Sequence, residues 1–151
     1  MKYRGFFLTF EGVEASGKST QIQKLTRYLK AKGFPVVVFR DPGSTPVSES
    51  IRKILLNPKN DVMDARTELL LYLAARAQLT EEKILPALKT GRIVICDRYE
   101  DSTLAYQGFG RGFSRRQIQL TSRVFVRDAL KPDLTFLLDM LLAVSIAVAL
   151  S

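Results

Sequence analysis

The stretch GVEASGKST, residues 12–20, decides how the rest of the sequence is interpreted. Four residues separate Gly12 from Gly17, and Lys18 and Ser19 follow, which matches the phosphate-binding loop pattern G-x-x-x-x-G-K-[ST]. Glycines allow the backbone to curl so that several N–H groups face one anion. In such loops the lysine bridges the β- and γ-phosphates and the serine hydroxyl ligates Mg²⁺. The stretch therefore predicts a site for a nucleoside triphosphate.

The flanking residues place this loop between a strand and a helix. Residues 6–10 form a short apolar run, and residues 18–32 have the apolar spacing of a helix that ends at Gly33. A helix that begins at the end of the loop directs its positive dipole end at a bound phosphate. Because motif and context agree, a chance glycine-rich turn is a poor explanation.

Three more strands and three more helices are predicted downstream. The strands are 35–39, 92–96 and 134–138; the helices are one after residue 46, one over 65–89 that bends before Pro86 and ends at Gly91, and one over 114–130. In the first of these helices, Ile51, Ile54 and Leu55 are expected to face the core. Continuous apolar strands that alternate with helices are typical of an α/β fold with a parallel sheet covered on both faces.

The polar loops 11–20, 40–46 and 97–112 each follow a predicted strand, so we expect them to meet at the carboxyl edge of the sheet. In the third loop, Asp97 directly follows an apolar strand and suits Mg²⁺ or its water shell, and Arg98 suits a second phosphate.

One helix carries a further candidate site. Tyr72 and Arg76 are four residues apart and share a helix face. They can stack on a base and bind its edge, although spacing alone fits a core aromatic and a surface arginine equally well.

Composition narrows the chemistry. The chain has 151 residues, the size of one domain, and a formal charge of +8 that suits a polyanionic partner. It has no histidine, which excludes histidine-based triads and histidine-ligated zinc. The single cysteine, Cys96, excludes a disulfide framework and favours a reducing compartment such as the cytoplasm.

Neither end of the sequence predicts a membrane segment. Glu11 comes too early for a signal peptide, and the apolar run 140–150 is shorter than the roughly 20 residues that a bilayer span needs. We interpret this run as a core helix or as a segment that lacks its continuation.

Five stretches together resemble the thymidylate kinase family, within the P-loop NTPase fold with its three α/β/α layers. They are FEGVEASGKST (10–20), FRDPGSTP (39–46), LLLYLAARAQ (69–78), ICDRYEDSTLAYQG (95–108) and KPDLTFLLD (131–139). The resemblance implies transfer of the γ-phosphate of ATP to dTMP, which gives dTDP and ADP for dTTP synthesis, with Mg²⁺ and in a homodimer. This reaction depends on positioning and charge neutralisation, so the absence of histidine is no obstacle.

The resemblance also implies roles for residues at matching positions. The residues expected to bind the ATP phosphates are Gly12, Ala15, Ser16, Gly17, Lys18, Ser19 and Thr20. Catalytic roles are expected for Lys18, Glu14, Asp97 and Arg98, with Ser19 and Asp97 at the metal. The residues expected to bind dTMP are Arg98, Arg40 or Arg52, Tyr72, Arg76, Thr103, Tyr106 and Gln107. Tyr72 stands where the family usually has a phenylalanine that stacks on thymine.

The sequence departs from the family pattern in its extent. Family members continue with a mobile lid, a fifth strand and contacts to adenine, and those without a basic residue at 13–16 carry catalytic arginines on the lid. Residues 13–16 are Val-Glu-Ala-Ser. We therefore expect a single P-loop kinase domain over 1–151 that lacks the last strand and the lid, either as part of a longer chain or as a shortened product. Alone, it is expected to bind nucleotides weakly and turn over slowly.

Three other functions remain open at this point. A kinase for deoxycytidylate or guanylate is the nearest, although donors at Tyr72, Arg76 and Gln107 favour thymine. A nucleotide-binding protein with little catalysis is the second. Nucleic-acid binding is the third, but the basic residues are scattered apart from Arg111, Arg115 and Arg116, which fit a solvated helix start. We expect neither a nucleic-acid nor a membrane partner, and a dimer through the helices 65–89 and 114–130.

Overall fold

A parallel β-sheet forms the centre of the fold. The computed structural model describes residues 5–126 and 130–140. Within these residues the strands are β1 (Phe6–Gly12), β2 (Val36–Arg40), β3 (Ile93–Asp97) and β4 (Leu134–Leu138), in the order β2-β3-β1-β4, and all neighbours are parallel. All four predicted strands are confirmed; β1, β2 and β3 end one or two residues later than expected.

The register of the sheet brings the predicted loops to one edge. Phe10 lies opposite Asp97, Asp97 lies opposite Arg40, and Gly12 lies opposite Leu138. The chain segments that follow β1, β2 and β3 therefore leave from the same carboxyl edge, as the sequence predicted.

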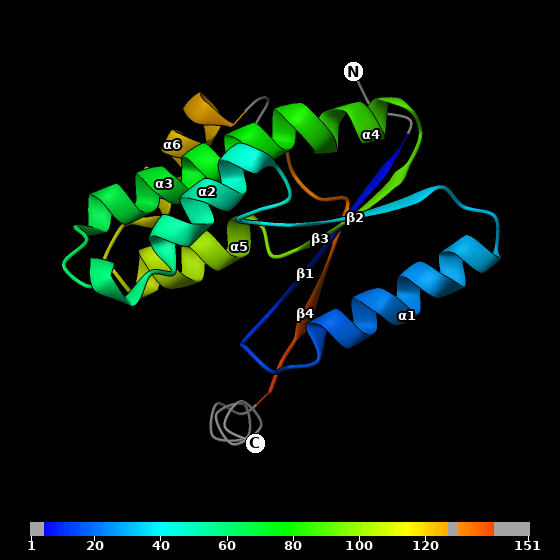
Figure 1. Ribbon diagram of the computed structural model, residues 1–151, viewed down its shortest axis with the longest axis horizontal. Coiled ribbons are helices and arrows are strands. Elements are labelled where there is room, and N and C mark those ends of the chain that lie inside the picture. The colour runs from blue at the N-terminus through cyan, green and yellow to red at the C-terminus, as the bar shows by residue number, and fades with distance from the viewer. Residues whose placement is uncertain (1–4, 127–129, 141–151) are drawn as a thin grey trace.

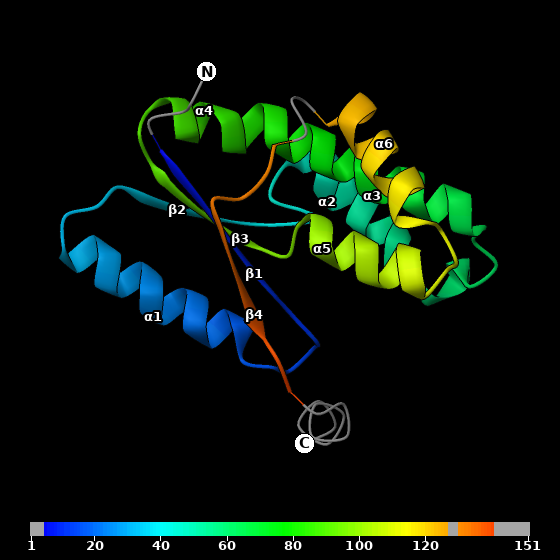
Figure 2. The ribbon, with the colours of Figure 1, turned by 180° about the vertical axis from the view of Figure 1, so that it is seen from behind.

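Helices cover both faces of the sheet, which confirms the three-layer α/β/α architecture. Figures 1 and 2 show α1 (Lys18–Ala31) alone on one side of the strands, and the other helices gathered on the opposite side. These are α2 (Pro46–Leu55), α3 (Ala65–Leu79), α4 (Leu85–Lys89), α5 (Glu100–Thr103) and α6 (Arg115–Phe125), with a short 3₁₀ turn, η1, at Pro58–Asn60. None of the helices in the described parts of the chain combines the length and apolar character that a bilayer crossing requires.

Local signals explain where three of these helices begin. Side chains of Thr45, Asp64 and Ser114 accept hydrogen bonds from backbone N–H groups in the first turns of α2, α3 and α6. At α6 the contact is reciprocal, because the Gln117 side chain accepts from the Ser114 backbone N–H, which completes a capping box.

The predicted helix over 65–89 is a continuous helical segment with a wider turn inside it. Between α3 and α4, residues Thr80–Ile84 form a π-helical turn, η2, and Pro86 is the second residue of α4. Proline has no N–H to donate to the preceding turn, which explains why the α-helical ladder changes here. Gly91, at φ 79°, ends the segment as predicted.

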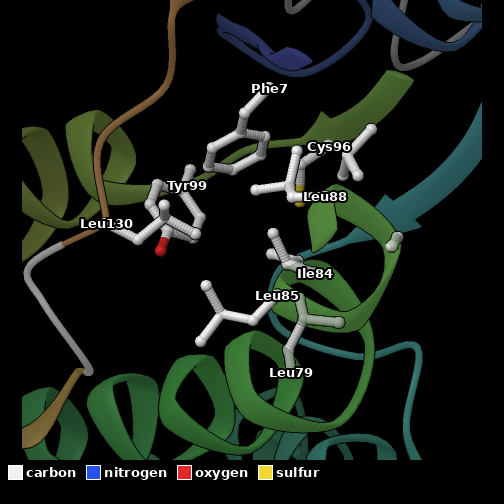
Figure 3. Close-up of a cluster of buried hydrophobic side chains, with 10 residues drawn as sticks. Phe7, Leu79, Ile84, Leu85, Leu88, Cys96, Tyr99 and Leu130 are labelled. Atoms are coloured by element: carbon white, nitrogen blue, oxygen red, sulfur yellow. The ribbon is translucent and has the colours of Figure 1, made fainter. Parts of the chain in front are cut away.

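The central strands β1 and β3 are apolar on both faces because each face of the sheet has its own core. On the side of α3 and α4, Phe7 and Cys96 pack with Leu79, Ile84 and Leu88 and with other buried side chains (Figure 3). On the side of α1, Leu8, Phe10 and Ile95 pack with Ile22 and Val36. Successive residues of a strand point to opposite faces, so no polar alternation is needed.

The helices differ from the prediction in two places. The predicted loop 97–112 contains α5 and a π-helical turn, η3 (Leu104–Phe109). This helical segment was missed because its buried residues are Thr103, Gln107 and Gly108, which give no apolar periodicity. The helix predicted over 114–130 ends at Phe125, since Val126 adopts extended backbone and is buried beside Leu69 and Ile118.

Two further predictions concern apolar side chains. Ile54 was expected to face the core but is 45% exposed, because α2 packs on α3 through the small Ser48, whose hydroxyl donates to the Ala75 carbonyl at 2.8 Å. The apolar run predicted as a core helix lies outside the described residues from 141 onward.

Candidate functional site

The loop after β1 has the curled backbone that its sequence predicts. Gly12, Ala15 and Gly17 adopt positive φ angles of 141°, 58° and 84°. Gly12 also lies against β4, where a Cβ atom would come within 2.5 Å of the Leu138 carbonyl oxygen. Such alternation of backbone conformation turns successive N–H groups to one side and makes an anion-binding concavity.

Lys18 lies over this loop at the start of α1. Its ammonium group donates to the carbonyl oxygens of Gly12 at 3.0 Å and Val13 at 2.6 Å, and the residue is 7% exposed. Burial lowers the pKa of Lys18, and the positive charge of Arg98 lowers it further. Two cations from different loops therefore repel each other at this edge of the sheet.

Asp97, at the end of β3, supplies negative charge at the same edge. Its Oδ1 atom is buried and has no hydrogen-bond partner in the described part of the chain. Residues 5–126 and 130–140 contain no group of three or more acidic, cysteine or histidine side chains that could hold a metal alone. Mg²⁺ typically takes one or two protein oxygens and completes its shell with phosphates and water, so Asp97 and the exposed Ser19 hydroxyl fit this cation.

Arg98 is held in an unusual backbone conformation, at φ 68°. Its N–H donates to the Phe10 carbonyl at 2.9 Å, and its guanidinium lies 3.2 Å from the Ser102 hydroxyl and 5.5 Å from the centre of the Tyr106 ring. These contacts direct the side chain along α5 and η3 instead of into solvent.

Glu11 forms hydrogen bonds with the residues that follow Arg98. It was not predicted as a functional residue. Its buried carboxylate accepts from the Tyr99 N–H at 2.7 Å and from the Ser102 hydroxyl at 2.5 Å. Burial raises the pKa of Glu11, and the hydrogen bond from Ser102 opposes that shift. The available sequence signal was a charged residue directly after the apolar run 6–10.

A cleft of about 150 Å³ opens beside these groups. Its lining includes eight of the predicted site residues: Glu14, Arg52, Tyr72, Arg76, Arg98, Thr103, Tyr106 and Gln107. The structure thus brings most of the residues predicted to bind dTMP around one space, although their roles in binding stay predictions.

Arg76 is the most buried cation in this lining, at 2% exposed. Its Nε donates to Asp41 Oδ2 at 2.6 Å, and its Nη2 donates to the Tyr99 carbonyl at 3.0 Å and to Thr103 Oγ1 at 2.7 Å. Its Nη1 has no partner among the described residues. Arg76 therefore has one donor group without a partner, and its burial contradicts the alternative interpretation of Arg76 as a surface arginine.

The two alternatives for a further phosphate ligand differ in position. Arg52 lines the cleft and donates to the Pro42 carbonyl at 3.1 Å. Arg40 is half-exposed, forms a two-point ion pair with Glu49 at 2.9 and 3.1 Å, and is absent from the lining. The geometry favours Arg52 over Arg40.

Gln107 is held by a residue that the sequence did not single out. Its side-chain amide donates to Glu68 Oε1 at 2.7 Å, and Arg111 donates to Glu68 Oε2 at 2.9 Å. Asp41, Glu68 and Glu11 were missed for one reason. Each acts through a hydrogen bond to a residue far away in the sequence: Asp41 to Arg76, Glu68 to Gln107, and Glu11 to Tyr99, and the sequence alone does not show these contacts.

Comparison with known proteins shows the family. The thymidylate kinase family model matches residues 10–149. A thymidylate kinase of Pelobacter propionicus is 51% identical over 135 residues, 89% of this chain and 61% of that protein. One from Geobacter sulfurreducens is 50% identical over 143 residues, 95% of this chain and 67% of that protein.

A solved structure agrees with the sequence comparison. The crystal structure of thymidylate kinase from Ehrlichia chaffeensis superposes with a TM-score of 0.81 at 39% identity, and covers 89% of this chain and 75% of that chain. This chain spans 61% and 65% of the length of two of its curated relatives. The loop 12–20, Asp97, Arg98 and the cleft therefore lie on a fold that is shared with a solved thymidylate kinase. The chain belongs to the thymidylate kinase family.

Proposed function

We propose that this chain binds ATP and dTMP and transfers the γ-phosphate of ATP to dTMP, which yields ADP and dTDP. The observation that carries the proposal is the meeting of Lys18 and Arg98, two cations from separate loops, beside Asp97 at one edge of the sheet. A phosphate between the two cations would relieve their repulsion. An enzyme that transfers a phosphoryl group between two phosphorylated substrates needs such an arrangement.

The donor side is the loop 12–20. Its positive-φ backbone turns N–H groups toward the phosphates, and Lys18 exchanges its contacts with the Gly12 and Val13 carbonyls for contacts with the β- and γ-phosphates. The N-terminal end of α1 adds a favourable dipole. Asp97 and Ser19 would hold Mg²⁺, which neutralises negative charge on the phosphates when it is bound.

The acceptor side is the cleft. Arg98 and Arg52, which line this cleft, would bind the dTMP phosphate, and Tyr72, also in the lining, would stack on the base. Phosphoryl transfer needs alignment and charge neutralisation more than a proton-abstracting side chain, which suits a site rich in arginine.

A coupled assay for ADP formation, with ATP, Mg²⁺ and dTMP, tests this function. Isothermal calorimetry with the four deoxynucleoside monophosphates should show tightest binding of dTMP. Preference for a purine monophosphate would contradict the proposed substrate. No detectable binding of ATP or dTMP would contradict the whole assignment.

We also propose that the protein is a cytoplasmic homodimer. Leu70 on α3 and Leu120 and Val124 on α6 are each at least half exposed, and these two helices pack side by side. A second copy that covers this apolar surface would remove it from water. Light scattering should give twice the monomer mass, and Val124→Arg should shift it to the monomer; a monomeric wild type contradicts the proposal.

A further inference from the structure

The side-chain amide of Gln107 is held with a defined polarity. Gln107 is 2% exposed, and its Nε2 lies 2.7 Å from Glu68 Oε1. An ionised carboxylate only accepts hydrogen bonds, so the NH₂ end of the amide must face Glu68. The amide oxygen is then the group that Gln107 retains for another partner.

Arg111 forms an ion pair with Glu68 and favours its ionised form. The guanidinium donates to both carboxylate oxygens, at 2.9 and 3.4 Å. Burial acts to raise the pKa of Glu68, but hydrogen bonds from Arg111 and Gln107 outweigh it and lower the pKa below its ordinary value. At neutral pH Glu68 therefore cannot donate a hydrogen bond to Gln107. The Gln107 amide keeps the orientation in which its NH₂ group faces Glu68.

The same cleft offers a complementary donor. Arg76 Nη1 is buried in this lining without a partner among the described residues. Arg76, which contributes to the lining of this cleft, is therefore a candidate donor to a bound base, and the amide oxygen of Gln107 is a candidate acceptor. Thymine carries the matching pair side by side on one edge of the base, because O4 accepts and N3–H donates. Cytosine carries the reverse pair, because its 4-amino group donates and its N3 accepts.

We propose that Glu68 is a positioning residue that gives the cleft its selectivity for pyrimidines with an N3–H over cytosine, by fixing the orientation of the Gln107 amide. This inference rests on the proposed function, since it names how the acceptor base would be read. Glu68 acts through Gln107 and does not contact the base itself.

The ratio of dissociation constants for dCMP and dTMP tests the inference, measured by calorimetry on the whole chain. Glu68→Gln is nearly isosteric but offers both a donor and an acceptor, so the Gln107 amide can adopt either orientation. In this variant the ratio of the dissociation constants should fall by on the order of 10-fold from the wild-type value. Glu68→Asp keeps an acceptor-only carboxylate and should restore much of the ratio. Arg111→Gln removes the guanidinium beside Glu68 but keeps the hydrogen bond between Glu68 and Gln107. This variant should retain the wild-type ratio of dissociation constants.

Each outcome separates this inference from the proposed function. If wild type binds neither nucleotide, the proposed function fails. If wild type prefers dTMP and a folded Glu68→Gln variant keeps that preference, the role of Glu68 is overturned. Should that variant fail to fold, N3-methyl-dTMP on the wild-type chain decides, because it lacks the N3–H. Binding of this analogue as tightly as dTMP overturns the inference, and weakened binding supports it.

Discussion

Arg76 and Asp41 form a buried ion pair, with Nε and Oδ2 2.6 Å apart and side chains that are 3% and 1% exposed. The pair joins α3 to the segment that follows β2, and Arg76 extends the connection to α5 through the Tyr99 carbonyl and Thr103. A residue that lines the cleft is therefore also a connection between three segments of the fold.

Removing the charge of Asp41 should destabilise the protein strongly. Asp41→Asn leaves the buried Arg76 charge without compensation, and breaking a buried pair typically costs about 3–5 kcal/mol. Urea unfolding should show this loss. The half-exposed Arg40–Glu49 pair provides a matched control, since Glu49→Gln should cost at most about 1 kcal/mol. Equal losses in the two variants would contradict the structural role of Asp41.

Gly12→Ala should destabilise more than Gly33→Ala. Both glycines have positive φ, at 141° and 83°, but a Cβ at Gly12 would lie 2.5 Å from the Leu138 carbonyl oxygen, whereas one at Gly33 meets nothing within 4 Å. Gly33→Ala should cost only the strain of the left-handed conformation, about 1–2 kcal/mol. Thermal unfolding should place the melting temperature of Gly12→Ala clearly below that of Gly33→Ala; the reverse order would show that β4 does not restrict this position.

The sheet was predictable from the sequence because its signals are local. Each strand is a short apolar run that a glycine or a charged residue ends, and parallel pairing follows from the alternation of strands with helices. The segment 100–109 was not predictable in the same way. Thr103 and Gln107 are buried there through hydrogen bonds to Arg76 and Glu68, so the apolar periodicity that indicates a helix is missing.

The site was predictable only for residues whose chemistry is read from a motif. Lys18 and Asp97 follow from their places in a loop and at a strand end, and their meeting at one edge follows from parallel strands. The supporting residues Glu11, Asp41 and Glu68 depend on contacts across 88, 35 and 39 positions of the sequence. No single-sequence pattern connects residues so far apart.

Arg52 and Arg40 should differ in their effect on dTMP. Arg52 lines the cleft, whereas Arg40 is held by Glu49 outside the lining. Loss of a hydrogen bond to a charged group costs about 1.5–3 kcal/mol, so Arg52→Ala should weaken dTMP binding by roughly 10- to 100-fold. Arg40→Ala should have a much smaller effect in the same calorimetric measurement. A larger loss in Arg40→Ala would show that Arg40 leaves Glu49 to bind the substrate.

The buried Glu11 should make the free energy of unfolding fall as the pH rises, and a substitution of Glu11 can reveal this dependence. Its folded-state pKa is raised above the ordinary value of 4.5, chiefly by burial. The folded state therefore holds this proton more tightly than the unfolded chain does. The stability that the proton contributes is fully present below pH 4.5 and is lost as the pH rises through the folded-state pKa.

Glu11→Gln keeps the shape of the side chain and removes the titration. The free energy of unfolding of this variant, minus that of wild type, should therefore become steadily more favourable to the variant between pH 4.5 and neutrality. Urea unfolding at several pH values measures this difference, and the other carboxylates cancel because both proteins carry them. A difference that stays constant with pH would mean that the hydrogen bonds from Tyr99 and Ser102 fully offset the burial of Glu11, so that its carboxylate is as stable inside the protein as in water.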